Sequence, residues 1–271
     1  METNDKPIGV FDSGIGGLTV AREIMEQLPL ESIVYFGDTA RVPYGSKSRE
    51  TVTQFAFEGI NFLLSQDVKM IVVACNTVSA TCLDMLQKFA PVPVVGVIEP
   101  GARAAVETTG TGVVGVIGTE RTIKSRAYEK AIHNLNREIT VYTRACPLFV
   151  PLVEEGWLDN EATLYTARVY LDPLKKKGID TLVLACTHYP LLKPALRRVM
   201  GENVQLVDSA CETAREVSRI LAEMKMERRR RQPPAYRYFV SDNPEKFIEV
   251  GERFLKRTID PISVIDPQVG C

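Results

Sequence analysis

The stretch MIVVACNT at residues 70–77 decides the fold, together with its echo TLVLACTH at residues 181–188. Both begin with a short apolar run and end in Ala-Cys followed by polar residues. Apolar runs of this length are typical of buried parallel strands that helices cover on both faces. The sequence therefore predicts two strand-and-turn units of the same kind within one chain.

The rest of the chain alternates between short apolar runs and amphipathic stretches, which predicts an α/β fold with mainly parallel sheets. Strands are expected at residues 7–11, 32–37, 70–74, 93–98, 112–117, 138–142, 181–185, 204–207 and 236–240. Helical stripes are formed by Leu18, Ala21, Ile24, Met25 and Leu28, by Cys82, Met85, Leu86 and Phe89, and by Leu192, Ala195, Leu196, Val199 and Met200.

Two weaker internal sequence repeats accompany the repeat of residues 70–77 at residues 181–188. GVFDS at residues 9–13 resembles GVIGT at residues 115–119, and IEPG at 98–101 resembles VDSA at 207–210. Three matches in the same order favour two pseudo-symmetric domains, although unrelated strand–turn–helix units can converge on a similar composition. We expect a discontinuous first domain of residues 1–98 and 208–271, and a second domain of residues 99–207.

Composition narrows the class of protein. The chain has 271 residues, of which 45% are hydrophobic and 25% charged, and its formal net charge is −1. This apolar content excludes a largely disordered chain. No apolar run approaches the roughly 20 residues of a membrane span, and no secretory signal pattern is present at the start. We expect a cytoplasmic protein with reduced thiols and with neither a membrane nor nucleic acid as a partner.

A basic run at residues 228–231 precedes Gln232, Pro233 and Pro234. We interpret it as a helix end followed by a linker. The alternative is an RNA-binding arm, but no aromatic residues are interleaved with these arginines, and the chain is not basic overall.

Cys75 and Cys186 are the strongest candidates for chemistry. Each follows a predicted strand and precedes a predicted helix, at the edge where open α/β sheets bind ligands. A thiol at a helix N-terminus is favoured as thiolate by the helix dipole. The alternative is that both are small buried apolar residues, but their matching contexts favour chemistry.

Polar neighbours of these cysteines could bind an anionic ligand. Thr77 and Thr187 offer hydroxyl groups and backbone amides to a carboxylate. His188 could tune the Cys186 thiol or carry a proton, although a lone histidine is more often structural. No metal ligand is assigned, because no Cys-x-x-Cys pair exists and the chain has only two histidines.

Two loops could complete a site. Asp12 and Ser13 begin DSGIGG at residues 12–17, which lacks the spacing of a dinucleotide or P-loop motif. Asp12 could hold an ammonium group or assist a base, or it could simply cap the next helix. In PYGS at residues 43–46, Tyr44 could close over a ligand, or the segment could be a plain turn.

Taken together, four motifs resemble those of the bacterial glutamate racemases of the aspartate/glutamate racemase superfamily. They are GVFDSGIGGL at residues 9–18, YFGDTARVPYG at 35–45, VVACNT at 72–77 and LACTHYP at 184–190. The resemblance implies two α/β domains with the active site in the cleft between them. It also implies that L- and D-glutamate are interconverted without any cofactor, that D-glutamate supplies peptidoglycan synthesis, and that the protein can form a homodimer.

The resemblance also implies roles for individual residues. Cys75 would take the Cα proton from D-glutamate and Cys186 from L-glutamate. Asp12 and His188 would assist the thiols, and Glu154 would lie near the second thiol. The implied substrate contacts are Asp12, Ser13, Pro43, Tyr44, Gly45, Asn76, Thr77, Thr187 and His188.

The chemistry of racemisation agrees with this assignment. Removing a proton from one face of Cα and returning one to the other requires two groups on opposite walls, which two related domains supply. Three rival functions remain: a racemase of aspartate or a related acid, a thiol redox protein that uses both cysteines, and an amino-acid-binding module without chemistry.

Overall fold

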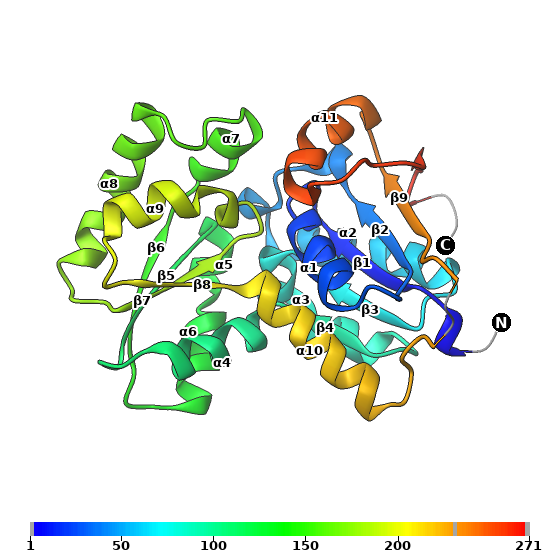
Figure 1. Ribbon diagram of the computed structural model, residues 1–271, viewed down its shortest axis with the longest axis horizontal. Helices are drawn as coiled ribbons and strands as arrows, with labels where there is room; N and C mark the ends of the chain where they lie inside the picture. Colours follow the sequence, from blue (N-terminus) through cyan, green and yellow to red (C-terminus); the bar gives the residue numbers. More distant parts are fainter. Residues whose placement is uncertain (1–2, 230–231, 269–271) are drawn as a thin grey trace.

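The computed structural model describes residues 3–229 and 232–268, and it forms two lobes, each built on a parallel sheet (Figure 1). The first sheet has the strand order β10-β9-β2-β1-β3-β4, and every neighbouring pair in it is parallel. Its strands are β1 (Ile8–Asp12), β2 (Ile33–Gly37), β3 (Met70–Val73), β4 (Val94–Gly96), β9 (Tyr236–Val240) and β10 (Ile262–Val264).

The second sheet has the order β6-β5-β7-β8 and is also parallel throughout. It forms the green and yellow lobe of Figure 1. Its strands are β5 (Val113–Gly118), β6 (Thr140–Ala145), β7 (Thr181–Ala185) and β8 (Gln205–Asp208). These two sheets confirm the predicted fold class.

Helices cover the sheets because the central strands are apolar on both faces. In β1, Val10 belongs to the core under α1, whereas Phe11 belongs to the core under α2 and α3. The helices are α1 (Leu18–Gln27), α2 (Arg49–Ser65), α3 (Asn76–Phe89), α4 (Ile98–Thr108), α5 (Glu120–Ser125), α6 (Ala127–Leu135), α7 (Phe149–Glu154), α8 (Glu161–Lys175), α9 (Lys193–Met200), α10 (Ser209–Glu223) and α11 (Pro244–Leu255).

The chain passes between the lobes twice. It leaves the first sheet after β4 through α4, and it returns after β8 through α10, which packs against both α1 and α4. Strands β9 and β10 then extend the first sheet beside β2, although they are far from it in sequence (Figure 1). We propose the division at residues 98/99 and 207/208 as the domain boundaries.

All nine predicted strands are present; two have the predicted ends, and the ends of the others are shifted by at most three residues. The tenth, β10, was not predicted, because it has only three residues and its side chains are mostly exposed. The stripe predicted on α3 is partly wrong: Leu86 is buried, but Met85 and Phe89 are 44% and 45% exposed. Cys82 has non-helical backbone angles, which interrupt the regular helical spacing on which the predicted stripe depends.

Within the described ranges, no helix is both long enough and apolar enough to span a bilayer. The basic run was predicted to be a helix end, but α10 already ends at Glu223, so Arg228 and Arg229 belong to the linker. Of the four arginines in that run, Arg230 and Arg231 lie outside the described residues.

Candidate active site

A cavity of about 310 Å³ lies between the two lobes, and both candidate cysteines line it. Cys75 comes from the carboxyl end of β3 and Cys186 from the carboxyl end of β7, so each sheet contributes one thiol. The residues that line the cavity are Ser13, Val42, Pro43, Tyr44, Gly45, Cys75, Asn76, Thr77, Thr119, Val150, Pro151, Glu154, Cys186, Thr187 and His188.

Cys75 is the N-cap residue of α3, as predicted, and its Sγ donates a hydrogen bond to Ser13 Oγ at 3.4 Å. The expectation that this position favours a thiolate is not met. Burial, followed by the nearby charge of Asp12, raises the pKa of the Cys75 thiol to about 12. Ser13 and the backbone amide of Val78 act in the opposite direction but do not compensate. The thiol is therefore protonated at neutral pH.

Cys186 is followed by a helical segment near Leu191, as predicted, but the first turn of this segment is not α-helical. A 3-10 turn at Tyr189–Leu192 follows it, and α9 begins only at Lys193. Pro190 occupies the first turn of the 3-10 segment, where its missing N–H costs nothing. Cys186 is therefore not at the N-terminus of an α-helix, and its polar surroundings come from Thr187 and His188 instead.

The buried His188 and the half-buried Glu154 form a pair on the second lobe's side of the cavity. His188 Nε2 lies 3.0 Å from Glu154 Oε1. Burial alone disfavours the imidazolium, but interactions with Cys186 and with Glu154 outweigh it and raise the pKa of His188 to about 10. Burial likewise opposes the charge of Glu154, but the contact with His188 lowers the pKa of its carboxyl. A cation thus lies beside Cys186 at neutral pH.

Asp12 is placed behind the cavity wall and does not line it. It is 1% exposed, and its Oδ2 accepts a hydrogen bond from the Gly14 amide at 2.9 Å. Burial raises the pKa of this carboxyl, while the charge of His188 and nearby backbone amides oppose the rise. Asp12 therefore acts on the site through charge and through the loop it holds, and a direct contact between Asp12 and a ligand stays a prediction.

Asp38 anchors the loop at residues 43–45 through hydrogen bonds. No role was assigned to Asp38 from the sequence. Asp38 is fully buried and accepts hydrogen bonds from Tyr44 Oη, from Arg41 Nε at 2.7 Å and from Ser241 Oγ at 2.8 Å. Arg41 also pairs with Glu58. Asp38 lies within the conspicuous motif at residues 35–45, so a signal was available, but its partner Ser241 is distant in sequence.

Thr119 is a second residue that sequence reasoning missed. It lines the cavity, and its Oγ1 lies 3.0 Å from Thr77 Oγ1. The weak echo between residues 9–13 and 115–119 pairs Thr119 with Ser13, so the signal was present in the repeat. The two hydroxyl-bearing residues occupy equivalent strand ends in the two lobes.

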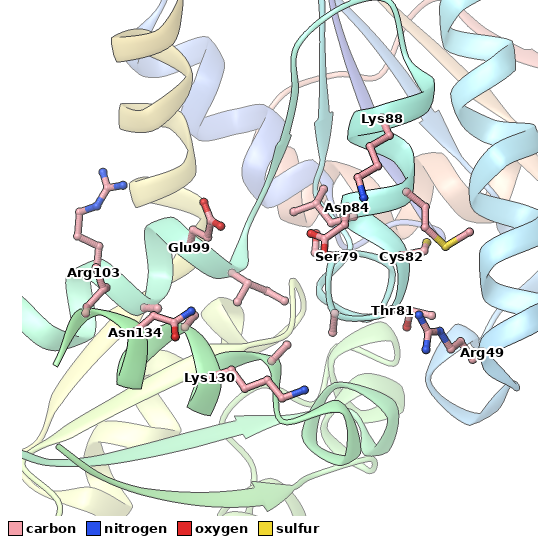
Figure 2. A pocket seen from close by; sticks show the side chains of 18 residues that line it. Arg49, Ser79, Thr81, Cys82, Asp84, Lys88, Glu99, Arg103, Lys130 and Asn134 are labelled. Carbon is pink, nitrogen blue, oxygen red and sulfur yellow. The ribbon is translucent and has the colours of Figure 1, made fainter. Parts of the chain in front are cut away.

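A larger hollow of about 590 Å³ lies between α3, α4 and α6, and neither Cys75 nor Cys186 reaches it. Figure 2 shows Arg49, Lys88, Arg103 and Lys130 around it, together with Asp84 and Glu99. The smaller cavity is the candidate active site, because it collects both thiols and the His188–Glu154 pair.

The remaining described cysteines do not join the site. Cys82 and Cys146 are buried, and Cys211 is partly exposed on α10. Cys271 lies outside the described residues. Among the residues described, no group of three or more His, Cys, Asp or Glu side chains could hold a metal ion.

Comparison with known proteins agrees with this geometry. The model of the Asp/Glu/hydantoin racemase family matches residues 8–217. A glutamate racemase of Geobacter metallireducens is 59% identical over 92% of this chain and 93% of its own length. The glutamate racemase of Francisella tularensis, solved with D-glutamate, superposes with a TM-score of 0.92 at 41% identity, over 97% of this chain and 98% of that one. A glutamate racemase isoform of Bacillus anthracis gives 0.93 at 44% identity, with the same coverage.

A parallel-sheet lobe on each side of a cavity, with one thiol from each lobe inside it, defines the class of two-domain racemases with paired cysteines. The chain belongs to the Asp/Glu/hydantoin racemase family and, within it, to the glutamate racemases.

Proposed function

We propose that the protein interconverts L- and D-glutamate with Cys75 and Cys186 as the two acid/base groups and without a cofactor. The observation that carries this proposal is that thiols from equivalent strand ends of the two sheets line one cavity. A family of relatives up to 59% identical and named glutamate racemase supports the choice of substrate.

In the direction from L-glutamate, Cys186 accepts the Cα proton and Cys75 returns a proton to the opposite face. The surroundings support this direction for the resting enzyme, because the cation of His188 lies beside Cys186 and the raised pKa of Cys75 keeps its thiol protonated. The roles reverse for D-glutamate. Each turnover moves one proton off carbon and one onto it, so atoms and charge balance.

The carbanion formed at Cα needs stabilisation, since the Cα proton is very weakly acidic. Hydroxyl groups of Ser13, Thr77 and Thr187 line the cavity and can hydrogen-bond the substrate carboxylates. Thr77 and Thr187 are buried beside the thiols, and contacts at such positions are stronger than in water. The loop at residues 43–45 lines the cavity next to Thr119, since a Cβ on Gly45 would lie 2.9 Å from the Thr119 side chain.

We further propose a cytoplasmic role in supplying D-glutamate for peptidoglycan, and a homodimer in solution. The first follows from the named activity of the relatives, and the second from the sequence resemblance alone. Light scattering during size-exclusion chromatography measures the mass and tests the second point.

The test of the function is incubation of the protein with D-glutamate in D₂O, followed by NMR of the α position and by optical rotation. We expect the α proton to be replaced by deuterium while the rotation falls to zero. Binding without exchange would indicate a binding module, and faster exchange with aspartate would indicate a related racemase. A Cys75–Cys186 disulfide under mild oxidation, without exchange, would indicate a redox protein.

A further inference from the structure

Tyr128 reaches from α6 of the second lobe to a residue of the candidate active site in the first lobe. Its side chain is 2% exposed, and its Oη donates a hydrogen bond to Asn76 Oδ1 at 2.7 Å. Burial raises the pKa of the Tyr128 hydroxyl, so it stays a donor across the working pH range. Asn76 begins α3 next to Cys75 and lines the cavity.

The hydroxyl of Tyr128 lies where the chain passes between the lobes. It is 3.4 Å from the carbonyl of Val97, which precedes α4, and it interacts with the side chain of Ser209, which begins α10. Gly101 on α4 leaves room for the ring, because a Cβ there would lie 3.2 Å from Tyr128 Oη. Groups from both segments that connect the lobes, at the starts of α4 and α10, therefore determine the position of the Tyr128 hydroxyl.

The hydrogen bond from Tyr128 determines the orientation of the Asn76 side-chain amide. The amide has one acceptor end and one donor end, and the tyrosine proton goes to Oδ1 in preference to the more distant Val97 carbonyl. Asn76 Nδ2 is then buried with no hydrogen-bond partner in the described part of the chain. A buried, unpaired amide donor on a cavity wall is suited to an anionic ligand, since leaving it unpaired is costly.

We propose that Tyr128 is a positioning residue that holds the Asn76 amide with Nδ2 towards a carboxylate of the substrate. The inference rests on the proposed function, because the ligand is taken to be glutamate. Tyr128 does not line the cavity, so it acts only through Asn76. Both enantiomers carry the same carboxylates, and their binding should weaken together when this hydrogen bond is lost.

The experiment compares Tyr128→Phe, Asn76→Ala and the double variant with the wild type. In Tyr128→Phe we expect KM to rise about five- to tenfold for both enantiomers, with a much smaller change in kcat. In the double variant KM should be no higher than in Asn76→Ala, because the two residues act as one unit. Tyr142→Phe on β6, a tyrosine of the same lobe outside the cavity, is the matched control and should keep the wild-type KM.

A second variant guards against misfolding of Tyr128→Phe. Gly101→Ala keeps the hydroxyl but displaces it by a few tenths of an ångström, so KM should rise in the same direction and by less. An unchanged KM in Tyr128→Phe, or effects of Tyr128→Phe and Asn76→Ala that multiply, would overturn the inference. Wild-type exchange in D₂O tests the proposed function separately, and the Kd for glutamate from calorimetry gives the same variant ratios without turnover.

Discussion

At the scale of single residues, two cysteines at equivalent positions have opposite electrostatic surroundings. Cys75 lies near the carboxylate of Asp12, and Cys186 lies beside the cationic His188. The repeat thus supplies equivalent positions for the two sulfur atoms, while the charged groups beside them differ in sign. Two predictions belong to this scale.

Replacing either cysteine should abolish turnover without unfolding the protein. Cys75→Ala and Cys186→Ala each remove one proton-transfer group, and a loss on the order of 10²–10⁴-fold is expected for such a group. Racemisation measured by circular dichroism and Tm measured on the same samples check this. Cys211→Ala, a partly exposed thiol outside the cavity, is the control and should stay active. An unfolded Cys186→Ala would instead support a purely structural role for this residue.

His188 should remain protonated well above neutral pH. Its pKa in the folded protein, about 10, exceeds the ordinary value of 6.5, so folding strengthens proton binding. The resulting stability is fully present below about pH 6.5 and is lost as the pH rises through 10. We expect the Cε1 proton signal of His188 to show no titration between pH 6 and 8, with His133→Asn used to assign the two histidines. In urea unfolding, the stability advantage of the wild type over His188→Asn should shrink as the pH rises from 7 to 10.

At the scale of elements, the site is made by strand ends and by the loops that follow them. The carboxyl ends of β1, β3 and β7 deliver Ser13, Cys75 and Cys186 because parallel strands all end at the same edge of a sheet. The loop at residues 43–45 has no such support from a strand. Asp38 supplies it instead, by binding Arg41, Tyr44 and Ser241.

Asp38→Asn should therefore damage both stability and substrate binding. The substitution keeps the shape but removes a charge that accepts three hydrogen bonds, and we expect the free energy of unfolding to fall by about 1–3 kcal/mol. KM should rise because Tyr44 and Gly45 line the cavity. Urea unfolding and steady-state kinetics measure the two effects. Asp159→Asn, in an exposed ion pair with Arg198, is the matched control and should change little. A wild-type KM in Asp38→Asn would contradict this role for the loop.

At the scale of the whole molecule, a buried ion pair holds the first lobe together at the end far from the site. Lys69 Nζ lies 2.6 Å from Glu31 Oε2, and both side chains are almost fully buried. Lys69 also donates to the carbonyls of Asn4 and Met226, so it joins the N-terminal segment to the segment that follows α10. Arg228 donates its backbone N–H to Glu31 in the same cluster.

Lys69→Met should separate stability from activity. Removing one partner of a buried ion pair leaves an uncompensated charge and is expected to cost about 3–5 kcal/mol of unfolding free energy. Lys69 precedes β3, whereas Cys75 follows it, so the folded variant should keep the wild-type KM. Lys6→Met, which breaks a partly exposed ion pair with Asp67, is the comparison and should cost less than about 1 kcal/mol. A large rise in KM for Lys69→Met would show that the two ends of the sheet are coupled.

The sequence by itself determined the α/β class, the nine main strands and the two cysteines, because each depends on local pattern. Apolar runs report burial on both faces of a strand, and the matching Ala-Cys contexts at residues 74–75 and 185–186 mark equivalent strand ends. The motifs were also specific enough to indicate the family.

Only the tertiary structure decided the electrostatics of the site and the contacts that cross the chain. Burial keeps the Cys75 thiol protonated although the helix dipole favours the thiolate. How deeply a side chain is buried depends on the whole fold and not on its neighbours in the sequence. Asp38–Ser241 and Asn76–Tyr128 join residues far apart in sequence, and they exist because two sheets and two crossings bring these segments together. The spacing of residues along the sequence does not show which distant residues are in contact. The contacts that position the residues around the two thiols could therefore be identified only from the tertiary structure.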